Sequence, residues 1–431
     1  MRAFANQTAR LGRERGPKVS YGGYARRIGA LVVVGALLGA ASASGSSGNE
    51  KAARSGARSA NGPLPARTRT NVERIVRRFQ DVNRTPGVLI GIWSPKGKFV
   101  SASGVADLAT GEPLRTDMQF KIASQTKAFT AELILQLVGE GKVSFEDHIS
   151  KWIAGVPNGD QITIRELLNH TSGLGNGLSP AIAARFTTGC TVKYLLDTEA
   201  KVPPVAKPGT TWSYSNYGYN LLGRVVELVT HERLNTALQR RIAKPLGLRR
   251  TLLPTSGNGL SAPFTHGYGT GEVAPTQAPA ASDDATSWPG SCLWAHGGMV
   301  STLRDLHVWS RALATGSLLK PAVWREAKRD PIPFKFAQNY NGPGRWAYGL
   351  GFDESGGFIG RTGSFAGYES SAYYSTARRT AIEVVSTKQP NAITPPPMFQ
   401  ALAMAVLGPH IGFGLTPAQA LKPNSFGAPG E

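Results

Sequence analysis

The sequence is poor in cysteine and histidine, and these scarcities exclude several classes of protein. Its 431 residues include only two cysteines, Cys190 and Cys292, too few for a cysteine-rich zinc module or a disulfide-dense scaffold. The seven histidines are scattered, and the chain has neither a His-Glu-x-x-His motif nor a Cys/His cluster. We therefore expect no metal site and no other cofactor.

Acidic residues are also few, 28 against 48 basic ones, which gives a formal net charge of +20. Half of this excess lies in residues 1–70, which carry 12 basic and 2 acidic residues. Binding of nucleic acid would need a basic face interleaved with aromatic residues on a folded domain, and the sequence shows none. We expect instead that the basic N-terminal segment meets a membrane surface or an anionic cell wall.

The N-terminal region resembles a targeting segment. A long basic stretch precedes an apolar run over 28–43, which is short for a membrane-spanning helix and ends in small residues. This pattern is typical of a bacterial secretory signal over 1–43, and an uncleaved N-terminal anchor is the alternative. Either would place the protein in the cell envelope or outside the cell. Residues 44–70 are rich in Ser, Gly, Ala, Arg and Pro, and we interpret them as a disordered basic linker.

The rest of the chain predicts strands at both ends and helices between them. Helices are predicted at 71–80, 124–138, 162–168, 219–230, 303–314 and 398–407. Strands are predicted in a hairpin over 87–105 and as antiparallel neighbours over 364–375 and 381–387. Residues 255–289, rich in Gly, Ala, Pro and Ser, are expected to form a long surface excursion near the cleft.

We therefore predict an α+β fold. An antiparallel sheet is formed from both chain ends, is flanked by helices and carries a mostly helical insert. The domain is expected over 71–410, followed by a C-terminal tail over 411–431. The sequence does not indicate an oligomeric state.

Ser124 and Lys127 are the first candidates for chemistry. They lie three residues apart at the start of a predicted helix, so they share one face of its first turn. The helix dipole favours negative charge near Ser124, and burial would lower the pKa of Lys127 and make it a base for the serine. The alternative is an N-cap serine followed by a solvated lysine. The spacing alone does not decide, because Ser317 and Lys320 repeat it.

Two later motifs give the Ser124 motif a context. Tyr214-Ser215-Asn216 is the only Tyr-x-Asn triplet in the chain, and Arg361-Thr362-Gly363-Ser364 precedes the last predicted strands. With these three motifs in this order, the chain resembles the serine β-lactamase and penicillin-binding DD-peptidase superfamily over about residues 71–407. The resemblance is greatest to the branch of class C β-lactamases, DD-carboxypeptidases and esterases. Supporting stretches lie at 167–174, 208–216 and 297–305.

The resemblance implies acyl-enzyme chemistry at this site. Ser124 would be the nucleophile, and Lys127 and Tyr214 would share the proton transfers. The backbone N–H groups of Ser124 and Ser364 would form the oxyanion hole. The residues implied in substrate binding are Asn216, Arg361, Thr362 and Gly363.

Purely structural roles are the alternatives for individual residues of these motifs. Tyr214 would also fit as an aromatic core residue, and Asn216 as a helix cap. Arg361 departs from the family, which usually has Lys or His at that position. Arginine can bind a carboxylate with two hydrogen bonds, but it cannot relay a proton. The alternative is that Arg361 points into solvent.

We expect an exported serine hydrolase that acts on a small-molecule or peptide substrate. The first candidate activity is D-alanyl-D-alanine carboxypeptidase-like action on cell-wall peptides, and the second is that of an esterase or a weak β-lactamase. A non-catalytic envelope protein that binds peptides in the same groove is the alternative from another class. In an exported protein Cys190 and Cys292 would be able to pair, and two free thiols are the alternative.

Overall fold

The computed structural model describes residues 62–269, 273–333 and 346–422. The predicted signal or anchor over 1–43, and the predicted linker as far as residue 61, lie outside these ranges. Within these ranges, no helix combines the length and the apolar character that crossing a membrane requires.

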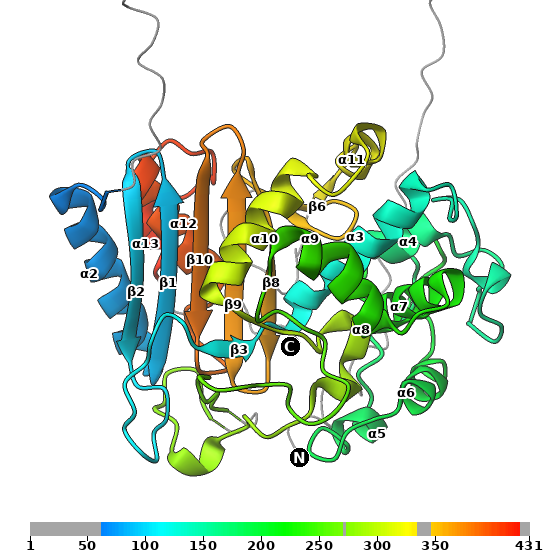
Figure 1. Cartoon of the computed structure of the whole chain (residues 1–431), viewed down its shortest axis with the longest axis horizontal. Helices are drawn as coiled ribbons and strands as arrows, with labels where there is room; N and C mark the ends of the chain where they lie inside the picture. The colour runs from blue at the N-terminus through cyan, green and yellow to red at the C-terminus, as the bar shows by residue number, and fades with distance from the viewer. Residues whose placement is uncertain (1–61, 270–272, 334–345, 423–431) are drawn as a thin grey trace, which may run out of the picture.

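An antiparallel sheet of eight strands forms the centre of the molecule (Figure 1). In spatial order the strands are β2 (Gly97–Gly104), β1 (Gly87–Ser94), β10 (Thr380–Ser386), β9 (Tyr368–Ser375), β8 (Phe358–Phe365), β7 (Asp353–Ser355), β6 (Trp346–Tyr348) and β5 (Ile332–Pro333). β1 pairs with β10, with Val88 opposite Ser386, so both ends of the folded chain meet in one sheet. The predicted α+β architecture and the predicted hairpin of β1 and β2 are confirmed.

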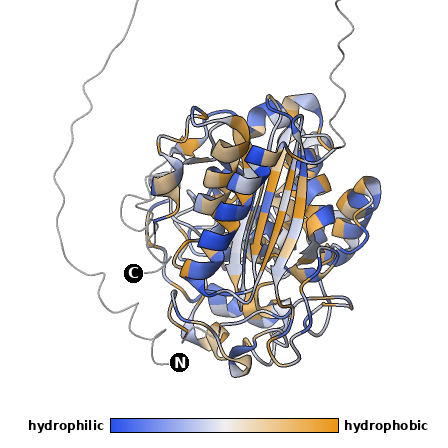
Figure 2. Cartoon of the chain, turned by 90° about the vertical axis from the view of Figure 1, so that its left-hand side faces the viewer, coloured by the Kyte–Doolittle hydropathy of each residue, from blue (hydrophilic) through white to orange (hydrophobic). Residues whose placement is uncertain are grey.

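Helices cover both faces of this sheet. α2 (Ala66–Asn83), α12 (Pro395–Leu407) and α13 (Pro417–Ala420) pack on one face, and α10 (Leu303–Thr315) crosses the other (Figure 1). Successive side chains of a strand point to opposite faces. In β1, Val88 and Ile90 accordingly join the core beside α2 and α12, whereas Leu89 joins the larger core on the other side. Figure 2 views the molecule from the α2 side and shows hydrophobic residues concentrated on the strands.

The folded domain extends beyond the predicted limits of 71 and 410. α2 begins at Ala66, directly after Pro65, and Leu64 is buried in the same core cluster as the apolar face of the helix. After α12 the chain continues through Ile411 and Phe413, which are buried in that cluster too. The linker prediction for 44–70 is therefore wrong at its end, and the tail prediction for 411–431 is wrong at its beginning.

The insert between the two halves of the sheet is mostly helical, as predicted. It contains the small ladder of β3 (Gln119–Lys121) with β4 (Val300–Thr302). Its helices are α3 (Thr126–Gly139), α4 (Ile164–Leu168), α5 (Pro180–Ala183), α6 (Val192–Glu199), α7 (Asn216–Thr230), α8 (Leu234–Leu238), α9 (Lys244–Leu246), α10 and α11 (Pro321–Ala327). α3 is buried on almost every side and not along a single apolar stripe, because α7, α8 and α11 all pack against it.

The predicted strand over 364–375 is wrong at its start. Ser364 and Phe365 are the last residues of β8, and Ala366 and Gly367 form a two-residue turn into β9. Both turn residues have positive φ, 45° and 85°, as a tight hairpin turn of type I′ requires. Ser364 therefore lies at the end of β8, beside the turn.

Most described residues of the segment over 255–289 are at least partly exposed, as the sequence predicts, and the segment is also tied to the end of the sheet. Tyr268 is buried, and Phe264 forms a bridge with Gln119 of β3. The Tyr368 hydroxyl of β9 donates to the Thr265 carbonyl at 2.6 Å. These contacts fix the loop beside the β8–β9 turn.

Candidate active site

Ser124 lies where β3 gives way to α3, in the 3₁₀ turn η1 (Ala123–Gln125). Ala123 has a φ of 45°, an uncommon conformation for a residue other than glycine. Such strain in a tight strand-to-helix turn is often found at functional sites. Ser124 itself is half-buried, whereas Ala123 and Gln125 on either side of it are buried.

The Lys127 side chain is fully buried one turn after Ser124. Its Nζ lies 3.2 Å from Ser124 Oγ, and it donates to Asn216 Oδ1 at 2.7 Å and to the His296 carbonyl at 2.9 Å. This lysine is therefore no solvated helix residue. It is held against the serine by acceptors from two other parts of the insert.

Tyr214 comes to Ser124 from the loop that precedes α7. Its hydroxyl donates to Ser124 Oγ at 2.9 Å. Ser215 caps α7 by accepting from the Gly218 N–H at 3.0 Å, and its own N–H donates to His170 Nδ1 at 3.2 Å. The cap of the helix thus fixes the backbone next to Tyr214.

Asn216 is the first residue of α7 and not its cap. Both ends of its amide are engaged inside the protein. The oxygen accepts from Lys127, and the nitrogen donates to Asn176 Oδ1 at 2.8 Å. In this state Asn216 orients Lys127, and its sequence-based role in binding a substrate amide stays a prediction.

Arg361 is buried, so the alternative in which it points into solvent is wrong. Its Nη1 donates to Asp353 Oδ1 at 2.6 Å, in a pair whose side chains are each 5% exposed. Its Nη2 donates to the Tyr214 hydroxyl at 3.3 Å. Arg361 therefore belongs to the same hydrogen-bonded chain as Ser124.

Burial sets the protonation of this cluster. It lowers the pKa of Lys127 well below the ordinary value, and the charge of Arg361 lowers that pKa further. Burial also raises the pKa of the Tyr214 phenol, although the neighbouring Arg361 opposes this shift. Both shifts favour the uncharged forms of the amine and the phenol beside the serine.

The end of β8 lies alongside η1 and completes the site. Thr362 donates its N–H to Asp353 and not to β9. Along an antiparallel ladder such N–H groups alternate in direction, so the Ser364 N–H, two residues later, also points away from β9. A Cβ on Gly363 would come within 2.1 Å of the Ile122 carbonyl and 3.2 Å of the Ser124 nitrogen. Only glycine allows β8 to approach η1 this closely.

Three residues of the site escaped the sequence analysis. Asp353 carries no motif and is brought to Arg361 by the pairing of β7 with β8. His170 lies in a turn-like segment, yet its ring contacts the Tyr214 ring with centroids 4.5 Å apart, and burial lowers its pKa well below the ordinary value. His296 contributes its carbonyl to Lys127. His170 lies in the family-like stretch at 167–174, which was the available signal for it, whereas His296 lies one residue before the stretch at 297–305.

Cys190 and Cys292 form a disulfide in the structure. It joins the segment before α6 to the turn that leads toward His296 and β4. The part of the chain that the structure describes contains no cluster of three or more His, Cys, Asp or Glu side chains that would hold a metal ion.

Comparison with known proteins agrees with this geometry. The Beta-lactamase family profile matches residues 72–403. Penicillin-binding protein 4 from Amycolatopsis lactamdurans is 32% identical over 181 residues, which cover 39% of this chain and 45% of that protein. Esterase EstB from Burkholderia gladioli is 33% identical over 168 residues, which cover 34% and 42%. The chain thus spans less than half the length of these curated relatives.

A solved structure extends the likeness over most of the fold. The D-stereospecific amidohydrolase from a Streptomyces species superposes with a TM-score of 0.63 at 26% identity. The superposition covers 75% of this chain and 94% of that one.

Proposed function

The chain belongs to the beta-lactamase family, and we propose that it is a serine hydrolase in which an ester or amide substrate acylates Ser124. The observation that carries this proposal is the continuous set of short contacts from Lys127 Nζ through Ser124 Oγ to the Tyr214 hydroxyl. A nucleophile within hydrogen-bond reach of a base and an acid is the arrangement that acyl transfer needs.

Lys127 would act as the base in the first step. A neutral amine has two N–H groups and one lone pair. The two N–H groups match the acceptors on Asn216 and His296, which leaves the lone pair for the Ser124 hydroxyl proton. As Ser124 Oγ bonds to the substrate carbonyl carbon, Lys127 takes that proton and becomes an ammonium.

Tyr214 would act as the acid in the second step. When the bond from the carbonyl carbon to the leaving group breaks, the phenol gives its proton to the departing oxygen or nitrogen. The guanidinium of Arg361 stabilises the phenolate that remains. Proton transfer from the Lys127 ammonium to this phenolate restores both groups, and the same pair then activates the water that releases the acyl group.

The backbone N–H groups of Ser124 and Ser364 would stabilise the tetrahedral oxygen. The Ser364 N–H points away from β9, and the Gly363 contact brings β8 against the Ser124 nitrogen. Fixed donors of this kind are worth about 10²–10³ in rate for one group. Thr362 and Gly363 would line the bound substrate at the same edge.

Two candidate activities follow for this site. One is D-alanyl-D-alanine carboxypeptidase-like action on cell-wall peptides, and the other is that of an esterase or a weak β-lactamase. We also propose that the protein is exported. The disulfide supports this, because disulfides persist in oxidising compartments, and the signal-like pattern over 1–43 agrees with it.

Covalent labelling tests the proposed nucleophile. A fluorophosphonate probe should label the wild-type protein once, and Ser124→Ala should abolish both the labelling and the hydrolysis of a p-nitrophenyl ester. Ser317→Ala is the matched control, because Ser317 repeats the Ser-x-x-Lys spacing but is exposed after α10. Labelling that persists in Ser124→Ala would place the nucleophile elsewhere, whereas a wild type that is not labelled would leave the non-catalytic peptide-binding alternative.

A further inference from the structure

We propose that the buried ion pair with Asp353 holds the Arg361 side chain against Tyr214 and away from the substrate. The site would then select acyl donors whose leaving group carries no carboxylate. The inference rests on the proposed function. Among the candidate activities it favours that of an esterase over those of a D-alanyl-D-alanine carboxypeptidase and a β-lactamase, since the departing nitrogen of a penicillin also lies next to a carboxylate. It favours neutral amides and esters over peptides that end in a free D-alanine carboxylate.

Each nitrogen of the Arg361 guanidinium faces an oxygen of the protein, which engages three of its five N–H groups. Nη1 donates to Asp353, Nη2 faces the Tyr214 hydroxyl, and Nε faces the Ser124 carbonyl at 3.4 Å. Arginine binds a carboxylate best through two parallel N–H groups. A substrate carboxylate would therefore compete, on every nitrogen, with an oxygen that the fold itself supplies.

Asp353 also accepts hydrogen bonds from groups other than Arg361. The Tyr373 hydroxyl donates to Asp353 Oδ2 at 3.1 Å, and the Thr362 N–H donates to the same carboxylate. The guanidinium carbon also lies 4.8 Å from the centre of the Tyr348 ring. Releasing Arg361 to the substrate would leave a buried carboxylate without its cation, which is strongly unfavourable.

The neighbouring lysines do not replace Arg361 as an anchor for a carboxylate. Lys127 is engaged with Ser124, Asn216 and His296. Lys121 of β3 is buried, and its Nζ donates to the carbonyls of Ala285 and Trp288 at 3.1 and 2.8 Å. Among the described residues, the groups that remain near the leaving side of a substrate are the half-buried Thr362 and the exposed Ser364, whose hydroxyl is hydrogen-bonded to Glu369. Their hydroxyls are neutral and suit a carbonyl or amide better than a charge.

A pair of thioesters that differ only in this charge tests the inference. N-acetyl-D-alanyl thioesters of thioglycolate and of thioglycolamide share the acyl group and the scissile bond, and thiol release reports on both. We expect kcat/KM for the thioglycolamide ester to exceed that for the thioglycolate ester by about tenfold or more, because the carboxylate loses water without gaining a cation. Equal values, or a preference for the thioglycolate ester, would overturn the inference.

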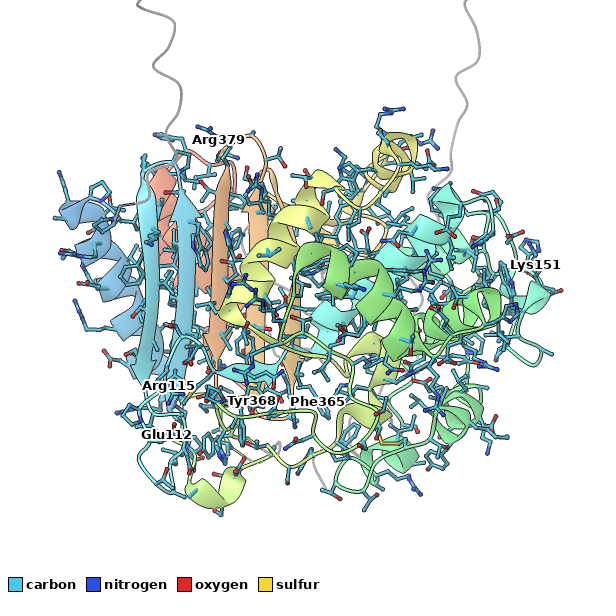
Figure 3. The ribbon with its side chains drawn as sticks, viewed as in Figure 1. Glu112, Arg115, Lys151, Phe365, Tyr368 and Arg379 are labelled. Atoms are coloured by element: carbon cyan, nitrogen blue, oxygen red, sulfur yellow. A yellow bond between two sulfur atoms is a disulfide. The ribbon has the colours of Figure 1, made fainter. Side chains whose placement is uncertain are left out.

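Arg361→Lys gives a second readout. A single ammonium cannot contact Asp353, Tyr214 and the Ser124 carbonyl together, so the ratio of the two kcat/KM values should move toward the thioglycolate ester. Arg379→Lys is the matched control, because Arg379 is exposed in the turn after β9. Figure 3 shows it at the end of the strands opposite to Phe365 and Tyr368. An unchanged ratio of the two kcat/KM values in a folded Arg361→Lys protein would contradict the proposal that Arg361 is held away from the substrate.

The outcomes separate the inference from the proposed function. Fluorophosphonate labelling at Ser124 with a preference for the carboxylate substrate would refute the inference alone. Absence of labelling together with absence of thioester hydrolysis would refute the proposed function, and the inference with it. If Arg361→Lys fails to fold, the ratio of the two kcat/KM values in the wild type still tests the inference.

Discussion

Lys127 lies among groups that disfavour its ammonium form. Burial is the largest of these influences and the charge of Arg361 is the second, while Glu199 and Asp353 oppose them. In the family Lys or His usually occupies the position of Arg361, and both can lose their charge. Arginine cannot, so here the cation beside Lys127 and Tyr214 is permanent.

This arrangement predicts the pH dependence of catalysis. Lys127 must be neutral to accept the Ser124 proton, so kcat/KM should fall only as the pH drops through its lowered pKa. The phenol of Tyr214 should keep its proton beyond its ordinary pKa of 10, which places the alkaline loss above that pH. The rate of p-nitrophenyl ester hydrolysis, followed from pH 5 upward, should therefore reach a plateau well below the ordinary lysine pKa of 10.5.

The double variant Asp353→Asn with Arg361→Gln tests the cause of this profile. It removes the permanent cation together with the smaller opposing charge of Asp353, so the pKa of Lys127 should rise and the acidic limb of the pH–rate profile should move to higher pH. Lys151→Gln is the control, since Lys151 is exposed and pairs with Asp147 (Figure 3). If the acidic side of the pH–rate profile is unchanged in the double variant, Arg361 does not set the pKa of Lys127.

For single residues, the sequence predicts site residues that lie in short motifs. It does not predict the residues elsewhere in the chain that contact them. Ser124 and Lys127 are three apart and lie together, because one turn of backbone fixes their separation. Asp353 meets Arg361 through a strand pairing in which Asp353 lies opposite Gly360. A contact that depends on register between strands has no signature in local spacing.

Among the elements, the approach of β8 to η1 determines whether the two backbone N–H groups face the same point. Gly363→Ala should lower kcat/KM by about 10²-fold, because the added methyl group pushes β8 away from the Ile122 carbonyl and separates the two donors. The far-UV circular dichroism should change little. Hydrolysis of the p-nitrophenyl ester at saturating and limiting substrate gives both kinetic constants.

Gly139→Ala is the matched control for this substitution. Gly139 ends α3, and a Cβ there would meet its nearest atom at an ordinary 3.5 Å. Wild-type activity in Gly363→Ala would show that the close approach of the strand is not required for turnover.

The elements also show where periodicity is informative and where it is not. The amphipathic pattern of α2 marks its buried face correctly, because that helix lies between the sheet and solvent. α3 is surrounded by other helices and is buried on almost every side, so an apolar stripe on one face does not describe it. The turn at Ala366 and Gly367 was missed, since the sequence around it alternates like one continuous strand.

For the whole molecule, the disulfide closes a loop of 102 residues that contains Tyr214, Asn216 and the helices around them. Replacing both cysteines by alanine should lower the free energy of unfolding by about 2–4 kcal/mol, mainly because the unfolded chain gains freedom. Thermal unfolding with and without a reductant measures this. The wild type should lose stability on reduction, and the double variant should not respond.

An equal unfolding temperature for reduced and oxidised wild type would contradict this role of the disulfide. The pairing itself was left open by the sequence, because a separation of 102 residues says nothing about distance in space. The overall architecture was predictable, since strands at both chain ends with helices between them have few ways to form one sheet.

The position of β1 between β2 and β10 has a consequence for how the protein is made. The N-terminal hairpin of β1 and β2 is complete early in synthesis, but two strands alone are at best marginally stable. Its partner β10 begins only at Thr380, so the central pairing must wait until nearly all of the chain has left the ribosome. Pairing across such a sequence distance is also slow. The nascent polypeptide therefore lacks its central sheet for most of its translation.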